Sequence, residues 1–236
     1  MVYGLIICAG KQSRFKSQTP KALVTVKGKT LLQRNIEAMS KECDKIYVVC
    51  SNQNQHYFDY KNKIFFESGK GSGDAVWQAL ERLNIKKGDF CYVLWGDALT
   101  TPEIYTQIKN AYKKDGVIPC VYESNPYVQI IPKENGGVSA KFSKFNEKTT
   151  AGYHDLSLFY FDADVLLKKL RDFRNKITDK NGNYCHKHGN EMELLDVFNE
   201  TNIKPDILEI KHYKDFSFNT VEQLKDLLEK QDVIEK

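Results

Sequence analysis

Short apolar runs alternate with helical periods along the first half of the chain. Residues 2–8 and 90–95 are apolar throughout, and each run is followed by a glycine within two positions. A short apolar run closed by glycine is typical of a buried strand that enters a loop. Further strands are predicted at residues 45–50 and 64–67, and helices at residues 30–42, 74–84 and 102–114. This repetition of strand, loop and helix predicts a mainly parallel sheet with helices on both faces.

The pattern changes after Gly116, where the apolar runs become shorter. Strands are predicted at residues 117–122, 127–132, 138–142, 156–161 and 207–211, and helices at residues 164–174, 191–199 and 220–230. The sequence contains no linker, internal repeat or low-complexity segment. We therefore expect one α/β domain over residues 1–236, with a first half of about 1–115 and a mixed-strand second half of about 116–236.

Composition narrows the class of protein. The chain has 236 residues, 41% of them hydrophobic and 28% charged, which is a globular balance. The formal charge is +4 and the basic residues are scattered among acidic ones, so we expect no nucleic-acid partner. The six cysteines form no C-x-x-C pair, and the N-terminal apolar run is too short for a signal peptide or a membrane span. These features predict a cytoplasmic protein without disulfides or membrane insertion.

A polar, basic loop follows the first predicted strand. It carries Gly10, Lys11, Ser13, Arg14 and Lys21 within twelve positions. Glycine lets the backbone approach a ligand closely, and backbone amides, a guanidinium and an ammonium can all face phosphate oxygens. The loop therefore indicates a phosphate site at the carboxyl end of a strand. A basic surface loop explains it equally well, because the spacing is neither a Walker A nor a dinucleotide motif.

Gly96 and Asp97 close the apolar run at residues 90–95. Proteins commonly hold Mg²⁺ through one or two carboxylates together with substrate phosphates. The alternative role for such an aspartate is a helix N-cap, which Thr100 or Thr101 would fill better. We therefore favour Asp97 as a magnesium ligand.

The order of motifs along nearly the whole chain resembles that of the sugar nucleotidyltransferase (pyrophosphorylase) family, in particular the uridylyltransferase domain of N-acetylglucosamine-1-phosphate enzymes. CAGKQSRF at positions 8–15 is similar to that family's AAGKGTRM-like loop, and PKAL at 20–23 to its P-K-x-L motif. GSGDAV at 71–76 resembles the GTGHA loop, and WGD at 95–97 the segment with the metal aspartate. Residues 190–196 resemble its NGEYYLTD helix, and FNT at 218–220 the late segment that supplies a second metal ligand.

The resemblance implies a GT-A-like fold with a Rossmann-like sheet, a nucleotide-binding first half and an acceptor-binding second half. Arg14 and Lys21 would contact the phosphates as catalytic residues, and Asp97 and Asn219 would hold Mg²⁺. The nucleotide-binding positions that it implies are Cys8, Ala9, Gly10, Lys11, Gln12, Ser13, Glu67, Gly71, Ser72 and Gly96. The implied reaction moves a nucleoside monophosphate from a nucleoside triphosphate to a small phosphorylated acceptor and releases pyrophosphate.

Two departures from the family bear on the nucleotide. Gln12 replaces the second glycine of the first loop, which restricts the approach of the backbone to a triphosphate. Glu67 lies beside the position of the uracil-reading glutamine. A carboxylate only accepts hydrogen bonds and cytosine offers an amino group, so Glu67 favours CTP over UTP. A solvated carboxylate at a strand end is an equally good explanation of Glu67.

Changes in the second half bear on the acceptor, which the resemblance places against Tyr127, Asp155 and Glu191. The family's polar sugar contacts are replaced here, and Asp155 could hold an ammonium group or be a surface residue at a strand start. A chain of this type without a sugar pocket resembles the CTP:phosphoglutamine cytidylyltransferases, which implies a role in capsule or cell-surface polysaccharide synthesis.

Other interpretations stay open. They are a UTP-dependent sugar-1-phosphate uridylyltransferase, a molybdenum-cofactor guanylyltransferase, which shares the fold and first loop, and a non-catalytic nucleotide-binding module. Cys185, His186 and His188 could offer three metal ligands, but they lie too close together for a structural zinc site of usual spacing. We therefore interpret residues 180–190 as a solvated loop beside the acceptor. The sequence leaves the base, the acceptor and a homo-oligomeric state undecided.

Overall fold

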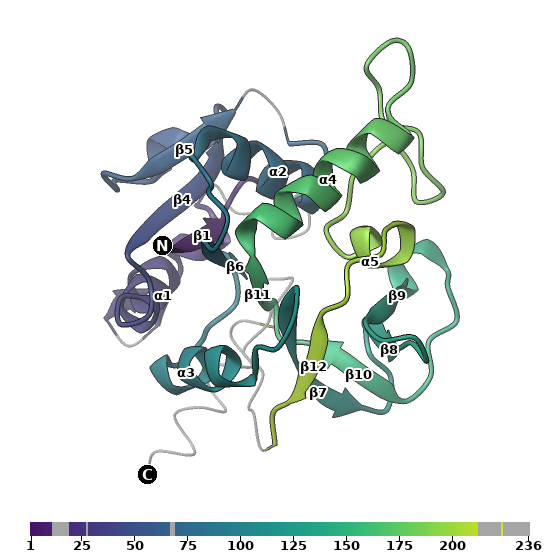
Figure 1. Cartoon of the computed structure of the whole chain (residues 1–236). Coiled ribbons are helices and arrows are strands. Elements are labelled where there is room, and N and C mark those ends of the chain that lie inside the picture. Colours follow the sequence, from purple (N-terminus) through teal and green to yellow (C-terminus); the bar gives the residue numbers. More distant parts are fainter. Residues whose placement is uncertain (11–18, 27, 67–68, 212–222, 224–236) are drawn as a thin grey trace.

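The computed structural model describes residues 1–10, 19–26, 28–66, 69–211 and 223 (Figure 1). Ten strands form one mixed sheet, namely β1 (Val2–Ile7), β4 (Lys45–Ser51), β5 (Lys63–Phe66), β6 (Phe90–Trp95), β7 (Gly116–Glu123), β8 (Val128–Pro132), β9 (Val138–Phe142), β10 (Gly152–Asp155), β11 (Leu158–Asp162) and β12 (Asp206–Glu209). The helices are α1 (Leu31–Met39), α2 (Ser72–Arg82), α3 (Pro102–Ala111), α4 (Ala163–Ile177) and α5 (Asp196–Glu200). The predicted α/β class and its helix-flanked sheet are confirmed.

The first half supplies a parallel block of four strands in the order β5-β4-β1-β6. β1 lies between β4 and β6, and its residues pair with both, so that Ile7 lies opposite Val49 on one side and Trp95 on the other. The strand order therefore reverses beside β1. Such a reversal opens a crevice at the carboxyl ends of the strands, because the two neighbouring connections leave in opposite directions.

Helices cover both faces of this block. α1 and α3 pack together over one apolar core, and α2 and α4 pack together over the other (Figure 1). Thr30 is the N-cap of α1 as predicted, and it forms a capping box with Gln33. α3 has Pro102 at its start and ends three residues earlier than predicted. Burial of one apolar side of each helix thus fixes the sheet between two helical layers.

The second half continues the same sheet with antiparallel pairs. β11 lies beside β6, and Leu158 is paired with Leu94. The sequence missed β10, and β11 begins two residues later than predicted, because Ser157 adopts a left-handed conformation (φ 59°) that separates the two strands. β12 returns to pair with β7 in parallel. The sheet therefore runs without interruption from one half of the chain into the other.

The helix predicted at residues 191–199 is wrong in its first turn. α5 begins at Asp196, and the residues before it run along the N-terminal end of α2, where the amide of Met192 donates to the carbonyl of Lys70. These residues satisfy their backbone groups against α2 and not within a helix. The final helix predicted at residues 220–230 falls outside the described residues.

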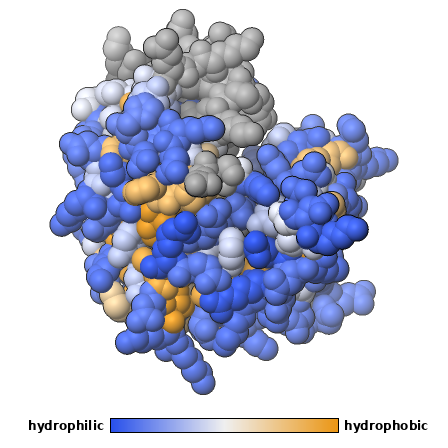
Figure 2. Space-filling view, turned by 90° about the horizontal axis from the view of Figure 1, so that it is seen from above, coloured by the Kyte–Doolittle hydropathy of each residue, from blue (hydrophilic) through white to orange (hydrophobic). Residues whose placement is uncertain are grey.

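The surface seen from above is mostly hydrophilic, with a narrow hydrophobic strip near its centre (Figure 2). Lys and Glu side chains form ion pairs across the surface, including Lys29 with Glu37 and Lys109 with Glu42. No helix within the described residues is long and apolar enough to cross a membrane.

Candidate functional site

Two predicted site segments meet at the crevice beside β1. Cys8 and Ala9 leave the end of β1, and the amide of Cys8 donates to the carbonyl of Val49 at 2.7 Å. Gly96 follows β6, and its amide donates to the carbonyl of Ile7 at 2.9 Å. Cys8 and Ala9 are buried, whereas Gly10 is exposed, and no described residue lies within 4 Å of a Cβ built there. The first loop therefore begins at the crevice as the sequence predicts.

Lys21 and Asp97 form an ion pair at this crevice, although they lie 76 positions apart in the sequence. The ammonium nitrogen of Lys21 lies 2.9 Å from a carboxylate oxygen of Asp97. The lysine side chain is 9% exposed and that of the aspartate 40%, so the pair joins a buried lysine to a carboxylate that is partly open to solvent. Asp97 does not cap α3, whose N-cap is Thr101, which removes the alternative interpretation of this residue.

Gly96 is required by close packing. A Cβ atom at this position would lie 2.5 Å from the sulfur of Cys8 and 3.0 Å from the carbonyl oxygen of Ile7. The first distance requires the sulfur of Cys8 to move, and the second requires the backbone of β1 to give slightly. Gly96 therefore lets the ends of β1 and β6 approach each other and fixes the position of Asp97.

The glycine-rich loop before α2 holds another segment of the same chain. The amides of Gly73 and Asp74 both donate to the carbonyl of Met192, at 2.8 and 3.2 Å. The hydroxyl of Ser72 donates to Glu193 and accepts from the amide of Leu194. Gly71 adopts φ 105°, and a Cβ there would lie 2.5 Å from the carbonyl of Met192.

Residues 192–194 thus form hydrogen bonds with the first turn of α2. Backbone donors at a helix start commonly bind anions, but those of Gly73 and Asp74 are already paired. Gly71 and Ser72 shape this loop through their contacts with residues 192–194. Glu193 is not among the predicted site residues, and it also forms an ion pair with Lys144.

The predicted acceptor residues do not share one environment. Asp155 is 6% exposed, so it is not a surface residue, and its carboxylate accepts from the amide of Ser157 at 2.9 Å. The carbonyl of Ser157 accepts from Trp95, which places this turn next to the Gly96–Asp97 segment. Tyr127 is 41% exposed, and Glu191 is exposed. Asp155 is therefore the predicted acceptor residue that the backbone connects directly to the crevice.

Six predicted site residues lie outside the described part of the chain. They are Lys11, Gln12, Ser13, Arg14, Glu67 and Asn219. Their assigned roles in binding phosphate, base and metal stay predictions.

The residues at the crevice fit a magnesium ion. Asp97 offers hard carboxylate oxygens, and its partial exposure lets it reach a cation that also contacts substrate phosphates. Lys21 beside it would share the neutralisation of those phosphates. Asp97 is the ligand that the described residues provide for this role.

The segment around His186 differs from the solvated loop that we predicted. The side chains of His186 and His188 are 7% and 3% exposed, and both face the buried carboxylate of Asp196. Cys185 is exposed and lies away from this group, with its sulfur 4.0 Å from Asp179. The sequence missed Asp196 because the helix predicted at residues 191–199 gave no reason to place it against the histidines.

Comparison with known proteins identifies the family to which this chain is similar. The model of the MobA-like NTP transferase domain matches residues 4–156. The bifunctional protein GlmU of Methanococcus vannielii is 32% identical over 178 residues, which cover 67% of this chain and 41% of that protein. The GlmU of Buchnera aphidicola is 29% identical over 193 residues, which cover 75% of this chain and 40% of that protein. The chain thus spans about two fifths of the length of these relatives.

Solved structures share the fold at low sequence identity. HddC from Yersinia pseudotuberculosis superposes with a TM-score of 0.68 at 16% identity, covering 98% of this chain and 99% of that chain. The inositol-1-phosphate CTP transferase from T. maritima superposes with a TM-score of 0.70 at 11% identity, covering 97% of this chain and 95% of that chain.

Proposed function

The chain belongs to the MobA-like NTP transferase domain family, and from that premise we propose that it is a magnesium-dependent nucleotidyltransferase acting on a small phosphorylated acceptor. The observation that carries the proposal is the ion pair between Lys21 and Asp97 at the point where the strand order reverses. A fixed ammonium beside a carboxylate suits a triphosphate with its metal ion.

In the proposed reaction, a phosphate oxygen of the acceptor attacks the α-phosphorus of the nucleoside triphosphate. A new P–O bond forms, the bond from the α-phosphorus to the bridging oxygen breaks, and pyrophosphate leaves with both electrons of that bond. Lys21 neutralises charge on the phosphates, and Asp97 keeps its ammonium directed into the crevice. A bound Mg²⁺ supplies Lewis-acid stabilisation of the phosphate oxygens.

For the base and the acceptor we propose CTP and the phosphate of an amino-acid-like molecule, as in capsule phosphoramidate synthesis. The choice of CTP depends on Glu67, whose carboxylate can accept from the amino group of cytosine. The choice of acceptor depends on Asp155, a buried carboxylate in the turn beside the crevice. An ammonium group that reached Asp155 would have to share this carboxylate with the amide of Ser157.

A second candidate is transfer of a uridylyl group from UTP to a sugar 1-phosphate. It is favoured by the identity of about 30% to the bifunctional GlmU proteins over most of this chain. The two candidates share the chemistry at Lys21 and Asp97 and differ only in the groups that read the base and the acceptor.

The experiment is a panel of CTP, UTP, dTTP, ATP and GTP against amino-acid phosphates and sugar 1-phosphates, with pyrophosphate release as the readout. We expect turnover with CTP that disappears in EDTA and returns with Mg²⁺. Efficient use of UTP with N-acetylglucosamine 1-phosphate would establish the second candidate. Failure of every combination to release pyrophosphate would contradict nucleotidyl transfer itself.

Variants test the ion pair that carries the proposal. Lys21→Met should lower turnover on the order of 10²-fold or more, the scale seen when a preorganised transition-state donor is lost. Lys29→Met is the matched control, because Lys29 is an exposed lysine paired with Glu37. Turnover of folded Lys21→Met equal to that of the control would exclude the proposed role, and a change in KM alone would indicate uniform binding.

A further inference from the structure

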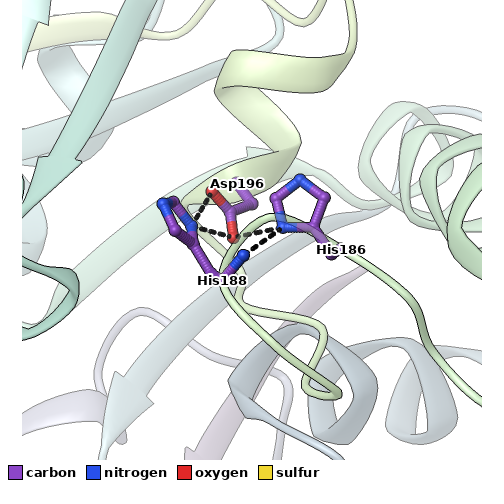
Figure 3. Close-up of side chains that lie close together, drawn as sticks. All are labelled: His186, His188 and Asp196. Carbon is purple, nitrogen blue, oxygen red and sulfur yellow. Dashed lines mark hydrogen bonds and ion pairs between the residues drawn. The ribbon is translucent and has the colours of Figure 1, made fainter.

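Two histidines and one aspartate lie close together in a buried cluster, apart from the crevice beside β1. His186 and His188 belong to the loop after α4, and Asp196 is the first residue of α5 (Figure 3). The figure shows the two rings directed toward the same carboxylate. One ligand atom from each residue lies within 4.8 Å of those of the other two. We propose that His186, His188 and Asp196 bind one divalent transition-metal ion of the Zn²⁺ type.

The distances fit a small tetrahedral ion. The Nδ1 atoms of His188 and His186 lie 3.0 and 3.5 Å from the same oxygen of Asp196. Ligands at tetrahedral positions around zinc, bonded at about 2.0–2.1 Å, are separated by roughly 3.3 Å. The two histidine–aspartate distances thus lie on either side of this separation, and the three ligand atoms all lie within 4.8 Å of one another. Imidazole nitrogens together with a carboxylate favour Zn²⁺ and its neighbours over Mg²⁺.

Hydrogen bonding defines the nitrogen of His186 that would bind the ion. The backbone amide of His188 lies 3.4 Å from Nδ1 of His186, a long hydrogen bond to the lone pair of this nitrogen that a metal ion bound there would replace. The same Nδ1 faces the oxygen of Asp196 at 3.5 Å. Two electron-rich atoms that face each other without a proton between them repel, and a cation between them removes that repulsion.

The outer nitrogens of both rings face carboxylates. Nε2 of His188 lies 3.4 Å from Glu147, and Nε2 of His186 lies 3.4 Å from Glu200. Metal-bound histidines usually direct their second nitrogen to a carboxylate, which fixes the ring and increases its basicity. Among the buried side-chain nitrogens and oxygens that the structure describes, only Nε2 of His188 has no hydrogen-bond partner. Metal binding at Nδ1 places the ring proton on this Nε2, where it can bond to Glu147.

The ion would act on the segment between its ligands. His188 and Asp196 enclose the stretch with Met192, whose carbonyl accepts from the first amides of α2. A metal that binds the folded chain joins the two ends of this stretch and holds it against α2, so that its binding free energy stabilises the fold. The site is therefore a structural one, and it is separate from the magnesium proposed at Asp97.

Tag-free protein, stripped with EDTA and dialysed, is titrated with Zn²⁺ and analysed by mass spectrometry of metal content after gel filtration. We expect one zinc per chain and an increase in Tm. His188→Gln and His186→Gln should lose this zinc. His154→Gln should keep it, because His154 pairs with Glu123 in another part of the sheet. Cys185→Ser should also keep it, since that thiol is exposed and outside the cluster.

Co²⁺ provides a test that needs no variant. The unaltered protein with one equivalent of Co²⁺ should show the visible absorption of a four-coordinate ion without a thiolate charge-transfer band. Glu147→Gln should weaken Zn²⁺ binding about 10-fold, as for other outer partners of metal ligands. Absence of stoichiometric zinc in the unaltered protein, or zinc retained by folded His186→Gln, would overturn the proposal. The same protein retains its proposed transferase chemistry in either case, so the two proposals fail separately.

Discussion

Replacement of Gly96 by alanine tests the close approach of β1 and β6. The new Cβ would lie 2.5 Å from the sulfur of Cys8, 3.0 Å from the carbonyl oxygen of Ile7 and 3.4 Å from Ala22. Overpacking of a well-packed core usually costs about 1–3 kcal/mol. We expect the upper part of this range, because the carbonyl of Ile7 belongs to a central strand that has neighbours on both sides.

A second substitution identifies the atom responsible. Cys8→Ala removes the sulfur and should by itself cost about 1 kcal/mol, the scale for deleting one buried heavy atom. In the double variant the shortest contact is absent and only the contact to Ile7 at 3.0 Å remains. The double variant should therefore be more stable, by about 1 kcal/mol or more, than the sum of the single effects predicts.

The assay is urea denaturation followed by circular dichroism and fluorescence, with Gly10→Ala as the matched control. Among the described residues, a Cβ at Gly10 meets nothing within 4 Å, so this control should change stability by no more than about 0.5 kcal/mol. Strict additivity of the Cys8 and Gly96 effects would refute the contact. So would a Gly96→Ala protein as stable as the control.

Three further outcomes follow from the structure. Ser72→Ala should destabilise the fold by about 1–3 kcal/mol in urea denaturation, because the buried amide of Leu194 loses its acceptor. The hydrogen bonds from Arg171 lower the pKa of Glu81 below its ordinary value, although burial opposes them. Glu81→Gln should therefore lower the free energy of unfolding by about 0.5–1 kcal/mol at neutral pH. This loss should shrink as the pH falls below the pKa of glutamate in the unfolded chain, about 4.3, and through the lower pKa of Glu81 in the folded protein. A loss that stays constant with pH would contradict the role of Arg171. In the native protein Cys185 should react first with iodoacetamide, as read by peptide mass spectrometry, because it is the exposed thiol.

The local pattern of the sequence determined the parallel half of the fold. Apolar runs closed by glycine predicted β1 and β6, and the capping residue Thr30 marked the start of α1. These features depend on residues that are close together in the chain. They also placed Gly96 and Asp97 at the carboxyl end of a strand, which was enough to predict a ligand site there. The family match over residues 4–156 agrees with the chemistry that these motifs indicated.

Contacts between distant residues decided the rest. Lys21 and Asp97 are 76 positions apart, and only the order of the strands brings them to 2.9 Å. α5 begins at Asp196 because residues 192–194 bind the start of α2 instead of continuing a helix. The same displacement turns Asp196 toward His186 and His188. The helical period of residues 191–199 cannot reveal that part of this segment bonds to α2 and not within a helix. Hydrogen bonds to a distant segment compete with local ones, and tertiary packing determines which are formed.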